Sequence, residues 1–308
     1  MGILKAGAVY VPLNTAYPTE RLKFILENAG ANYLVYTGES IINTFDLGIS
    51  NSWSFDACKA ASAQNPGIIT APESPVYIMY TSGTTGKPKG IAVCNRNVLK
   101  LVFEPGVIAV NASDRMLQWS NYAFDGSTYE IFGALLNGAS LQLIKDEWAS
   151  DAAALSGVIH NEKVTVSFIT TALFNAFMDT APEKLLGMRR ILFGGEMVSL
   201  PHVKRGLEVL GNDRIIHVYG PTETTTFATA YPINSIENGR TIPIGRPLAN
   251  TRLYVLDAGG ALAPMGVPGE LLIGGDGVAL GYINNPELTS EKFVVNPFGQ
   301  QSDDRLYR

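Results

Sequence analysis

The chain has 308 residues, of which 46% are hydrophobic and 17% are charged, and this is enough apolar sequence for a large core divided over two or three units. Its net charge of −5 argues against a general affinity for nucleic acid or an anionic membrane, and no apolar stretch reaches the length of a bilayer span. Cys58 and Cys94 form neither a metal-ligand spacing nor a disulfide framework, so we expect a cytoplasmic protein.

The N-terminal part alternates between strand and helix patterns. "AVYVPL" (8–13) predicts a strand, "PTERLKFILENAG" (18–30) a helix with one apolar face, and "NYLVYTG" (32–38) a second strand. Residues 39–73 are more polar and irregular, and they predict a connection. The helical pattern of the first residues begins without a cap and the last residues end without a turn, so we expect the natural protein to continue at both ends.

From residue 75 the alternation becomes regular. Strands are predicted near 75–80, 115–120, 140–144, 164–169, 189–193 and 214–219, and helices near 125–137, 171–179 and 200–211. Strands that alternate with helices and are apolar throughout indicate parallel sheets covered by helices. After about residue 235, "TRLYVLD" (251–257) and "GELLIGG" (269–275) are strands separated by turns rich in glycine and proline, which predicts a small all-β unit.

We therefore predict an α/β fold with two parallel-sheet subdomains and a small all-β subdomain. The predicted boundaries are 1–74 for a partial first α/β subdomain, 75–235 for an α/β subdomain that carries the ligand sites, and 236–308 for a β-barrel-like subdomain.

The loop "YTSGTTGKPKG" (80–90) follows an apolar run and concentrates hydroxyls, glycines and two lysines. Glycines let backbone N–H groups approach an anion, hydroxyls donate hydrogen bonds and lysines supply positive charge. The spacing differs from a Walker A loop, because Gly83 and Gly86 are too close together and Pro88 stands where the Mg²⁺-binding hydroxyl belongs. A flexible surface turn would explain the glycines but not the hydroxyls and lysines, so we predict a phosphate-binding loop.

The segment "FDGSTYEIFGALLNG" (124–138) places Asp125 in the first turn of a predicted helix. Helix capping and the helix dipole explain an aspartate there. Tyr129 lies four residues on and shares the same face, so an aromatic ring would stand beside the carboxylate. A cap does not need that ring, whereas a pocket for an organic ammonium would. From these residues alone we favour the cap.

The predicted strand near 214–219 is followed by a polar cluster, "YGPTETTT" (219–226). Glu223 lies among four threonines, and Tyr219 precedes them. A carboxylate with adjacent hydroxyls after a parallel strand suits Mg²⁺ and phosphate oxygens, and a tyrosine ring offers a face for a base. A capped helix start would explain Thr222 alone, so we favour a ligand site.

Two further features of the sequence bear on chemistry. The strand near 189–193 ends in Gly194-Gly195, after which a ligand can approach the backbone. The three histidines, His160, His202 and His217, form no triad-like or metal-like cluster in sequence, and the position of His217 inside a strand predicts packing rather than catalysis.

Taken together, these stretches resemble the adenylate-forming superfamily and, within it, the adenylation domains of nonribosomal peptide synthetases. The segments similar to successive core motifs of that family, in its order, are "LKAGAVYVPLNTAYPTERLKFILENAG", "YTSGTTGKPKG", "FDGSTYEIFGALLNGASL", "VYGPTETT" and "GELLIGGDGVALGYINNPELTSEKF". The resemblance implies a ligase that uses ATP and Mg²⁺ to activate an amino acid as its adenylate and passes it to a phosphopantetheine thiol. The implied partners are a peptidyl carrier protein, neighbouring synthetase domains and an MbtH-like helper, with no nucleic acid and no membrane.

The resemblance also implies roles for matching residues. Those expected around the ATP phosphates are Thr81, Ser82, Gly83, Thr84, Thr85, Gly86 and Lys89. Glu223 would hold Mg²⁺ and Thr222 would contact the α-phosphate, so that these two and Lys89 form the implied catalytic set. Tyr219 would stack on adenine with Gly195 beneath it, and Gly220 belongs to the same nucleotide-binding set.

Asp125 would pair with the α-ammonium of the substrate, which reverses the preference for a cap. The implied specificity pocket consists of Gly126, Tyr129, Phe168, Leu192, Gly194, Val218, Thr226 and Phe227. None of these residues is charged, so a charged substrate side chain would be buried unpaired at high cost. We expect Gly126 and Gly194 to leave room inside an apolar lining, which favours a branched aliphatic amino acid, isoleucine ahead of valine or leucine.

The chain departs from the family pattern in a few places. Asn95 stands where the family usually has histidine, and His217 where it favours asparagine. The sequence stops before the ribose-binding aspartate, and the hinge and small C-terminal domain with its lysine are absent, so we expect these 308 residues alone to be weakly active or inactive. Two alternatives remain open: an acyl- or aryl-CoA ligase, which would have no use for Asp125, and a nucleotide-binding fragment without catalysis.

Overall fold

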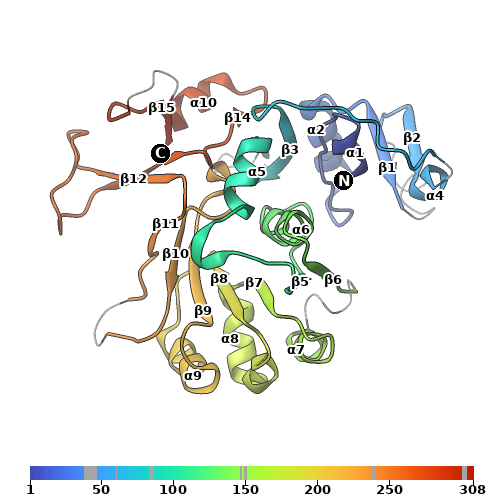
Figure 1. Ribbon diagram of the computed structural model, residues 1–308. Helices are drawn as coiled ribbons and strands as arrows, with labels where there is room; N and C mark the ends of the chain where they lie inside the picture. Colours follow the sequence, from blue (N-terminus) through green and yellow to red (C-terminus); the bar gives the residue numbers. More distant parts are fainter. Residues whose placement is uncertain are drawn as a thin grey trace. The chain divides into compact units, whose positions relative to one another are not determined.

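The computed structural model divides into two compact units. It describes residues 1–37, 47–59, 61–82, 87–145, 148, 151–237, 241–299 and 304–308. Unit 1 consists of Met1–Asn95, Tyr122–Phe124 and Ala279–Glu291, and unit 2 consists of Arg96–Asn121, Asp125–Val278 and Lys292–Arg308. Figure 1 labels their helices and strands. The division into three subdomains at residues 74 and 235 stays a prediction.

Unit 1 begins with the short helix α1 (Gly2–Lys5) and continues to α2 (Thr19–Ala29). The predicted helix at 18–30 is confirmed: α2 buries its apolar face and ends at Gly30, whose φ of 63° is left-handed. The predicted strand at 8–13 is wrong, because this segment forms only an isolated bridge from Tyr10 to Tyr77. Pro12 in that segment has no N–H to donate to a ladder.

A small parallel pair follows in unit 1. β1 (Tyr33–Tyr36) confirms the strand predicted from 32, and it pairs in parallel with β2 (Asn51–Ser54). The segment 39–73 is therefore not wholly irregular, since β2 and the one-turn helix α4 (Phe55–Cys58) lie within it.

The second sheet of unit 1 is antiparallel. Its strands, in order, are β14 (Gly281–Tyr282), β4 (Lys89–Cys94) and β3 (Pro75–Thr81). The strand predicted near 75–80 is thus present, but its expected place in a parallel sheet is wrong. The sequence between Thr81 and Lys89 is too short for a crossover, which needs about a dozen residues, so the chain returns antiparallel.

The main sheet of unit 2 has seven strands in the described part of the chain. In their order across the sheet they are β11 (Arg246–Pro247), β10 (Thr229–Pro232), β9 (Ile215–Tyr219), β8 (Arg190–Gly194), β7 (Val166–Thr170), β5 (Arg115–Gln118) and β6 (Ser140–Leu143). The strands from β9 to β6 are parallel, as predicted. β10 and β11, which the sequence did not indicate, extend one edge in antiparallel fashion.

Helices cover both faces of this sheet. They are α6 (Gly126–Leu136), α7 (Ala152–Asn161), α8 (Thr171–Thr180) and α9 (Leu200–Leu210), and α5 (Asn95–Val102) precedes them in the chain. The 3₁₀ turns are η1 (Gly106–Ile108), η3 (Pro182–Leu185) and η4 (Thr222–Thr224). Figure 1 shows α6 on one side of the sheet and α7, α8 and α9 on the other. The helices α6, α8 and α9 were predicted, and α5 and α7 were not.

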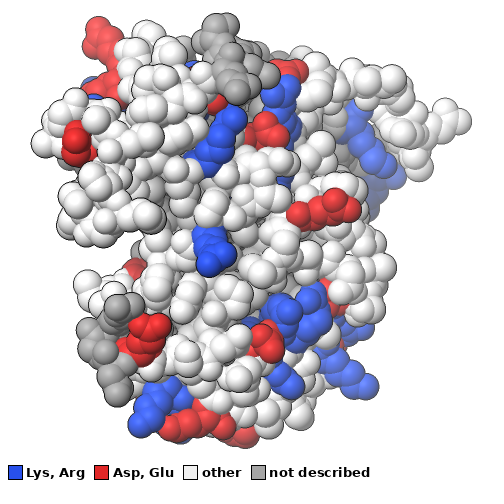
Figure 2. Space-filling model, turned by 60° about the vertical axis from the view of Figure 1, so that its left-hand side comes forward, with Lys and Arg blue, Asp and Glu red and all other residues white. Residues whose placement is uncertain are grey.

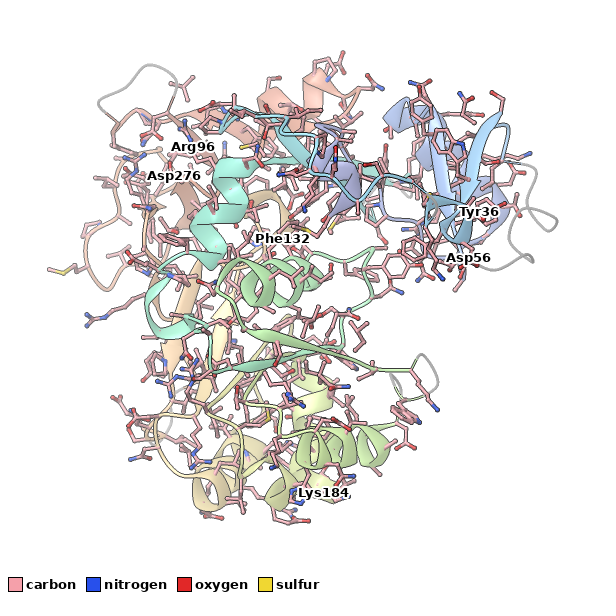
Figure 3. The ribbon with its side chains drawn as sticks, turned by 45° about the vertical axis from the view of Figure 1, so that its right-hand side comes forward. Tyr36, Asp56, Arg96, Phe132, Lys184 and Asp276 are labelled. Carbon is pink, nitrogen blue, oxygen red and sulfur yellow. The ribbon has the colours of Figure 1, made fainter. Side chains whose placement is uncertain are left out.

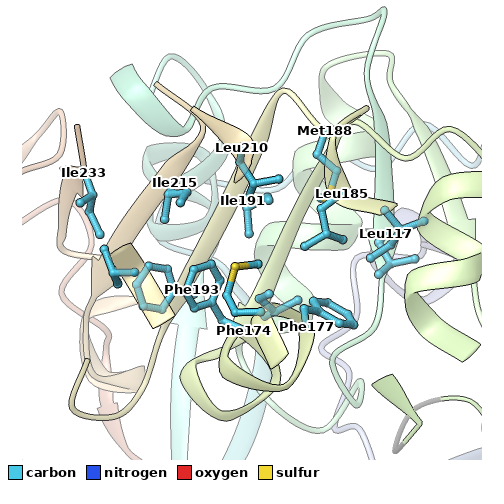
Figure 4. Close-up of a cluster of buried hydrophobic side chains, with 14 of the residues drawn as sticks. Leu117, Phe174, Phe177, Leu185, Met188, Ile191, Phe193, Leu210, Ile215 and Ile233 are labelled. Carbon is cyan, nitrogen blue, oxygen red and sulfur yellow. The ribbon is translucent and has the colours of Figure 1, made fainter. Parts of the chain in front are cut away.

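The largest apolar cluster lies between the sheet and the helices α7, α8 and α9. Figure 4 shows its centre, where the rings of Phe174 and Phe193 stack with centroids 4.4 Å apart. Because inward residues of each strand meet this cluster, the residues between them face α6 instead.

The last part of unit 2 contains an antiparallel sheet. Its strands, in order, are β12 (Thr251–Leu256), β13 (Glu270–Gly275), β16 (Arg305–Tyr307) and β15 (Phe293–Val295). The strands predicted at 251–257 and 269–275 are confirmed. The helix α10 (Pro286–Lys292) was not predicted within the all-β region.

A glycine in β8 fixes how closely two parallel strands approach. A Cβ on Gly194 would lie 2.1 Å from the carbonyl oxygen of Val218, so Gly194→Ala must displace backbone and should destabilise the protein by about 1–3 kcal/mol or more. Gly157 of α7 is the matched control, because no atom lies within 4 Å of its missing Cβ. Gly157→Ala should stabilise by about 0.5–1 kcal/mol, as in any open helical site. Chemical denaturation of both variants measures the change in the free energy of unfolding. If the two variants change it equally, the close approach of β8 and β9 at Gly194 is refuted.

Candidate active site

The candidate site of unit 2 begins where β8 and β9 end. Gly194 pairs with Val218, and the next residues, Gly195 and Tyr219, leave the same edge of the sheet, since the carboxyl ends of parallel strands lie together. The ring of Tyr219 is 38% exposed. Gly195 is exposed with a φ of 94°, and no atom lies within 4 Å of its missing Cβ. A flat ligand can therefore meet an aromatic face and an open stretch of backbone at this edge.

After Tyr219 the chain folds back in a tight turn, residues 220–228. A Cβ on Gly220 would lie 2.5 Å from the carbonyl oxygen of Thr226, so only glycine permits this approach. Thr225 and Thr226 both adopt left-handed backbone, with φ of 59° and 66°. Such conformations cost a non-glycine residue roughly 1 kcal/mol or more each, and they persist only when neighbours hold them.

The hydroxyls of this turn mostly hold the protein together. Thr224, Thr225 and Thr226 donate to the carbonyl oxygens of Pro221 (3.1 Å), Gly277 (2.8 Å) and Asp125 (2.9 Å), respectively. These three hydroxyls therefore donate within the protein, and a role of the threonine cluster in binding a ligand stays a prediction. Thr222 differs, because its hydroxyl donates to the carboxylate of Asp125.

Asp125 directly precedes α6 and is half-buried. Its backbone is helical (φ −66°, ψ −20°) and its side chain makes no N-cap hydrogen bond, so the interpretation as a helix cap is not supported. Burial raises the pKa of its carboxyl group and the charge of Glu223 raises it further, whereas hydrogen bonds from Thr222 and the Gly126 N–H oppose both. Two neighbouring carboxylates at the edge of a sheet favour a bound cation.

The residues present fit a magnesium ion that is shared with phosphate groups. Glu223 is buried beside Asp125 and next to the Thr222 hydroxyl, and such oxygen donors suit Mg²⁺. Among the described residues, no group of three or more His, Cys, Asp or Glu side chains is placed to hold a metal ion. Mg²⁺ commonly uses one or two carboxylates and completes its shell with phosphate oxygens and water, so such a group is not required.

Aromatic rings pack where the specificity pocket was expected. The Phe227 ring makes edge contacts with Tyr129 (5.3 Å between centroids) and Phe168 (4.9 Å). The Tyr129 hydroxyl donates to the carbonyl oxygen of Ile108 at 2.6 Å and is therefore satisfied inside the protein. Phe168 is half-buried, whereas Tyr129, Leu192, Val218, Thr226 and Phe227 are buried. A ligand can thus reach this cluster from the side of Phe168 and Asp125.

The two glycines of the expected pocket act differently from the prediction. We expected Gly126 and Gly194 to leave room, but a Cβ on Gly126 would lie 2.7 Å from Ser120 Oγ and 3.0 Å from the Phe168 ring. Gly194 faces the backbone of β9. Both glycines therefore let neighbouring groups close in, and the prediction of spare room is wrong.

The predicted phosphate loop belongs to unit 1 and is described only at its ends. Thr81 at the end of β3 pairs with Lys89 at the start of β4, and Ser82 follows Thr81. The Lys89 ammonium lies 5.0 Å from the centre of the Tyr282 ring. Gly83, Thr84, Thr85 and Gly86 lie outside the described residues. The gathering of this loop with Thr222 and Glu223 around one phosphate chain stays a prediction.

Sequence reasoning missed a buried carboxyl group behind the site. Glu130 of α6 is fully buried and accepts hydrogen bonds from Ser120 N–H (3.1 Å) and Ser120 Oγ (2.7 Å). Ser120 is the residue that a side chain at Gly126 would strike. Burial raises the pKa of Glu130 to about 8, against the opposing effect of the Ser120 hydrogen bonds. A lone glutamate in the otherwise apolar segment "YEIFGALL" was the available signal.

The histidines do not enter this site. His217 is buried, its Nδ1 lies 2.8 Å from the carbonyl oxygen of Pro243, and burial lowers its pKa, which confirms the packing role. His202 lies between Ser199 (2.6 Å) and Asp179 (3.2 Å). That trio was not visible in sequence, and it links the end of α8 to the start of α9, on the opposite side of the sheet from α6.

Comparisons with known proteins identify the family of the chain. A family model described as "AMP-binding enzyme" matches residues 1–283. The chain is 47% identical to part of Bacitracin synthase 1 from Bacillus licheniformis over 309 residues, and 42% identical to part of Tyrocidine synthase 3 from Brevibacillus parabrevis over 309 residues. Each match covers 100% of this chain, but only 6% of the first synthase and 5% of the second, so the chain spans a small fraction of these relatives.

Solved structures show the same fold. The Klebsiella oxytoca NpsA N-terminal subdomain in complex with 3-hydroxybenzoyl-AMSN matches with a TM-score of 0.89 and 29% identity, over 99% of this chain and 76% of the solved subdomain. PA1221, described as an NRPS protein containing adenylation and PCP domains, matches with a TM-score of 0.89 and 30% identity, over 99% of this chain and 53% of PA1221. The predicted α/β fold is thereby confirmed.

The charged side chains are mixed on the one face of the molecule that Figure 2 shows. On the face shown in Figure 2, basic and acidic side chains occur in small mixed groups between uncharged areas. In the part of the chain that the structure describes, no helix is both long and apolar enough to cross a membrane.

Glu130 should make stability depend on pH. Because its pKa is raised from 4.5 to about 8, the folded state holds a proton there that the unfolded state releases above pH 4.5. This contribution is complete below pH 4.5 and is lost as the pH rises to 8, by up to about 4 kcal/mol. Glu130→Gln should remove that decline from unfolding free energies measured between pH 5 and 8. Glu208→Gln, on the exposed side of α9, should keep the wild-type slope, and an unchanged slope in Glu130→Gln would contradict the assignment.

Proposed function

Because this chain belongs to the family of AMP-binding enzymes, whose model matches residues 1–283, we propose that it activates an amino acid as its acyl adenylate. The observation that carries the proposal is the carboxylate of Asp125, which is half-buried beside Glu223 and lies at the accessible side of an uncharged aromatic cluster. An α-ammonium group bound there would pair with the carboxylate of Asp125 and would lower its raised pKa. Similarity to parts of peptide synthases supports the same reaction.

The reaction joins the substrate carboxylate to the α-phosphorus of ATP. A carboxylate oxygen forms the new bond to phosphorus, the bond from that phosphorus to the bridging oxygen breaks, and pyrophosphate leaves with the electron pair. No proton needs to move, so catalysis consists of positioning and charge stabilisation. Asp125 would hold the ammonium and so orient the carboxylate.

The nucleotide would bind along the carboxyl ends of β8 and β9. Its base would stack on the exposed ring of Tyr219 beside Gly195, and the Thr222 hydroxyl would contact the α-phosphate. Glu223 would hold Mg²⁺, which when bound supplies charge neutralisation to the phosphates. The loop of unit 1 that carries Thr81, Ser82 and Lys89 has the composition of a phosphate-binding loop, and we propose that it binds phosphate groups.

The side chain of the substrate would lie against the uncharged cluster. A charged group would be buried there without a partner, which is costly. Because the cluster is packed and Phe168 is its accessible member, a compact branched aliphatic side chain fits best, with isoleucine first. This preference rests on shape alone, and one methylene is worth only about 1–3 kcal/mol.

The acyl group would then pass to the phosphopantetheine thiol of a carrier protein: the sulfur bonds to the acyl carbon, the bond from that carbon to the phosphate oxygen breaks, AMP leaves and the thiol loses its proton. Support comes from solved relatives described as an adenylation–PCP di-domain, NpsA-ThdA, and as a protein containing adenylation and PCP domains, PA1221. Requirement for an MbtH-like protein and a cytoplasmic setting stay predictions.

A second candidate substrate class is an aryl acid. NpsA was solved with 3-hydroxybenzoyl-AMSN, a compound whose acyl part has no ammonium group. The aromatic rings of Phe168 and Phe227 could stack on such an acid. The carboxylate of Asp125 argues against it, because that charge would be left buried without a cation.

The substitution Asp125→Asn tests the proposal in the protein that carries this chain. It keeps shape and removes the charge, so kcat/KM for isoleucine should fall by two or more decades, as expected when a buried ammonium loses a partner worth about 2–5 kcal/mol. The melting temperature should barely move. ATP–pyrophosphate exchange with isoleucine, its deaminated analogue and 3-hydroxybenzoate measures the effect, and the mutant should treat isoleucine and the analogue alike.

Asp114→Asn is the matched control. Asp114 is also buried, and it pairs with Arg189 at 2.6 Å, outside the candidate site. Its loss should lower stability and leave the preference for isoleucine over the deaminated analogue intact. Exchange by the wild type with 3-hydroxybenzoate and not with any amino acid would establish the second candidate instead. An Asp125→Asn protein that keeps its preference for α-amino acids would remove the basis of the proposal.

A further inference from the structure

A buried lysine lies behind the candidate site. Lys100 of α5 is 4% exposed, and its ammonium donates a hydrogen bond to the carbonyl oxygen of Phe227 at 2.7 Å. Phe227 is the residue whose ring meets both Phe168 and Tyr129. The lysine therefore contacts the main chain of the residue at the centre of the aromatic cluster.

The lysine is the centre of an interlocked set of backbone contacts. Asn97, one turn earlier on α5, donates to the carbonyl oxygens of Asp276 (2.7 Å) and Val278 (3.0 Å). Between them, the Gly277 carbonyl accepts from Thr225. A Cβ on Gly277 would lie 2.8 Å from the Thr224 carbonyl oxygen and 3.1 Å from the lysine ammonium. Helix α5, the 276–278 segment and the 220–228 turn thus close around one charge.

These hydrogen bonds hold the 220–228 turn in its strained backbone conformation. Thr225 and Thr226 are both left-handed, which they adopt only when fixed by neighbours. The Thr225 hydroxyl is fixed by Gly277, and the carbonyl that follows Thr226 is fixed by Lys100. Thr226 in turn donates to the main chain of Asp125, so a displacement of the turn would reach the proposed ammonium ligand.

The charge itself is maintained at a cost. Burial lowers the pKa of Lys100 to about 8, and the carboxylate of Asp276 opposes this shift. Asp276, which is labelled in Figure 3, is therefore the acidic side chain whose charge acts on Lys100. An apolar side chain could fill the same volume, but it would leave the carbonyl oxygen of Phe227 without the hydrogen-bond donor that Lys100 supplies.

We propose that Lys100 is a positioning residue of the adenylation site, which holds the 220–228 turn so that Phe227 closes the side-chain cluster and Thr226 fixes Asp125. This role deepens the proposed function and rests on it. Lys100 touches neither the amino acid nor the nucleotide. Its loss should therefore affect recognition of the amino acid far more than recognition of ATP.

The test uses three variants in the protein that carries this chain. Lys100→Met keeps the length and removes both charge and donor, Lys100→Arg keeps both, and Leu101→Ala opens a cavity at the next, fully buried residue of the same helix. For Lys100→Met we expect KM for isoleucine to rise at least about tenfold while kcat and KM for ATP change less than about threefold. The preference for isoleucine over valine should shrink, and Lys100→Arg should restore at least half of it.

Hydrogen exchange gives a readout that needs no turnover. Amides of residues 222–228 should exchange at least about tenfold faster in Lys100→Met than in the wild type, and Leu101→Ala should accelerate exchange throughout the unit without selecting this turn. Should Lys100→Met fail to fold, Lys100→Gln replaces it, since its amide has no charge and a shorter reach to the Phe227 carbonyl; the isoleucine-to-valine ratio should then fall while KM for ATP stays unchanged.

The outcomes separate this inference from the proposed function. Unchanged exchange in 222–228, or equal changes in KM for isoleucine and ATP, would overturn the positioning role while amino-acid activation stands. The same pattern in Leu101→Ala would also overturn it, because general destabilisation would then explain the effect. If none of the amino acids supports ATP–pyrophosphate exchange by the wild type, the proposed function is refuted. Faster hydrogen exchange of residues 222–228 in Lys100→Met would then show only that the lysine stabilises the turn.

Discussion

The close approach of β8 and β9 is the constraint on which the candidate site depends. Gly194 lies so near the carbonyl of Val218 that no side chain fits between the strands, and this fixes where both strands end. Gly195 and Tyr219 consequently leave the sheet side by side, and the 220–228 turn starts from a defined point. Asp125 directly precedes α6 and lies beside Glu223 of this turn, so the groups that we propose for the amino acid, the base and the α-phosphate belong to one unit.

Ionisable groups inside this unit divide into those that hold the site and those that face a ligand. Glu130 and Lys100 are almost fully buried and bond mainly to Ser120 and to the Phe227 carbonyl, on either side of the aromatic cluster. Burial raises the pKa of Glu130 and lowers the pKa of Lys100, which favours the neutral form of each side chain. Either group would destabilise the fold if it were buried without a hydrogen-bond partner. Asp125 differs, because it is half-buried and lies beside a second carboxylate. Two neighbouring carboxylates favour a bound cation at this position.

The sequence predicted which residues lie at the ends of the parallel strands. It did not predict the roles of residues whose function depends on a particular contact in the folded protein. The strand pattern placed Gly195 and Tyr219 at the ends of neighbouring parallel strands, where the structure has them. For Asp125 the residues alone favoured a helix cap, and only the resemblance to the family implied a role in binding the ammonium. Glu130 and Lys100 were missed because a single charged residue in a helix normally faces water. The glycines at 126 and 194 were misjudged, since sequence does not show which atom would meet a Cβ. Antiparallel β4 was missed because its residues continue a glycine- and lysine-rich loop.

Substrate class and substrate identity rest on interactions of different strength. Removing one partner of a buried ammonium–carboxylate pair costs about 2–5 kcal/mol of binding free energy. A substrate either has the ammonium group or lacks it. The contacts of Phe168 and Phe227 with an aliphatic side chain differ by only about 1–3 kcal/mol per methylene, and the rings can shift to accommodate a neighbouring shape. Electrostatics at Asp125 should therefore decide that an α-amino acid binds, whereas the rigidity of the turn that carries Phe227 decides which one. On this view, the accuracy of side-chain selection depends on groups such as Lys100 that never touch the substrate.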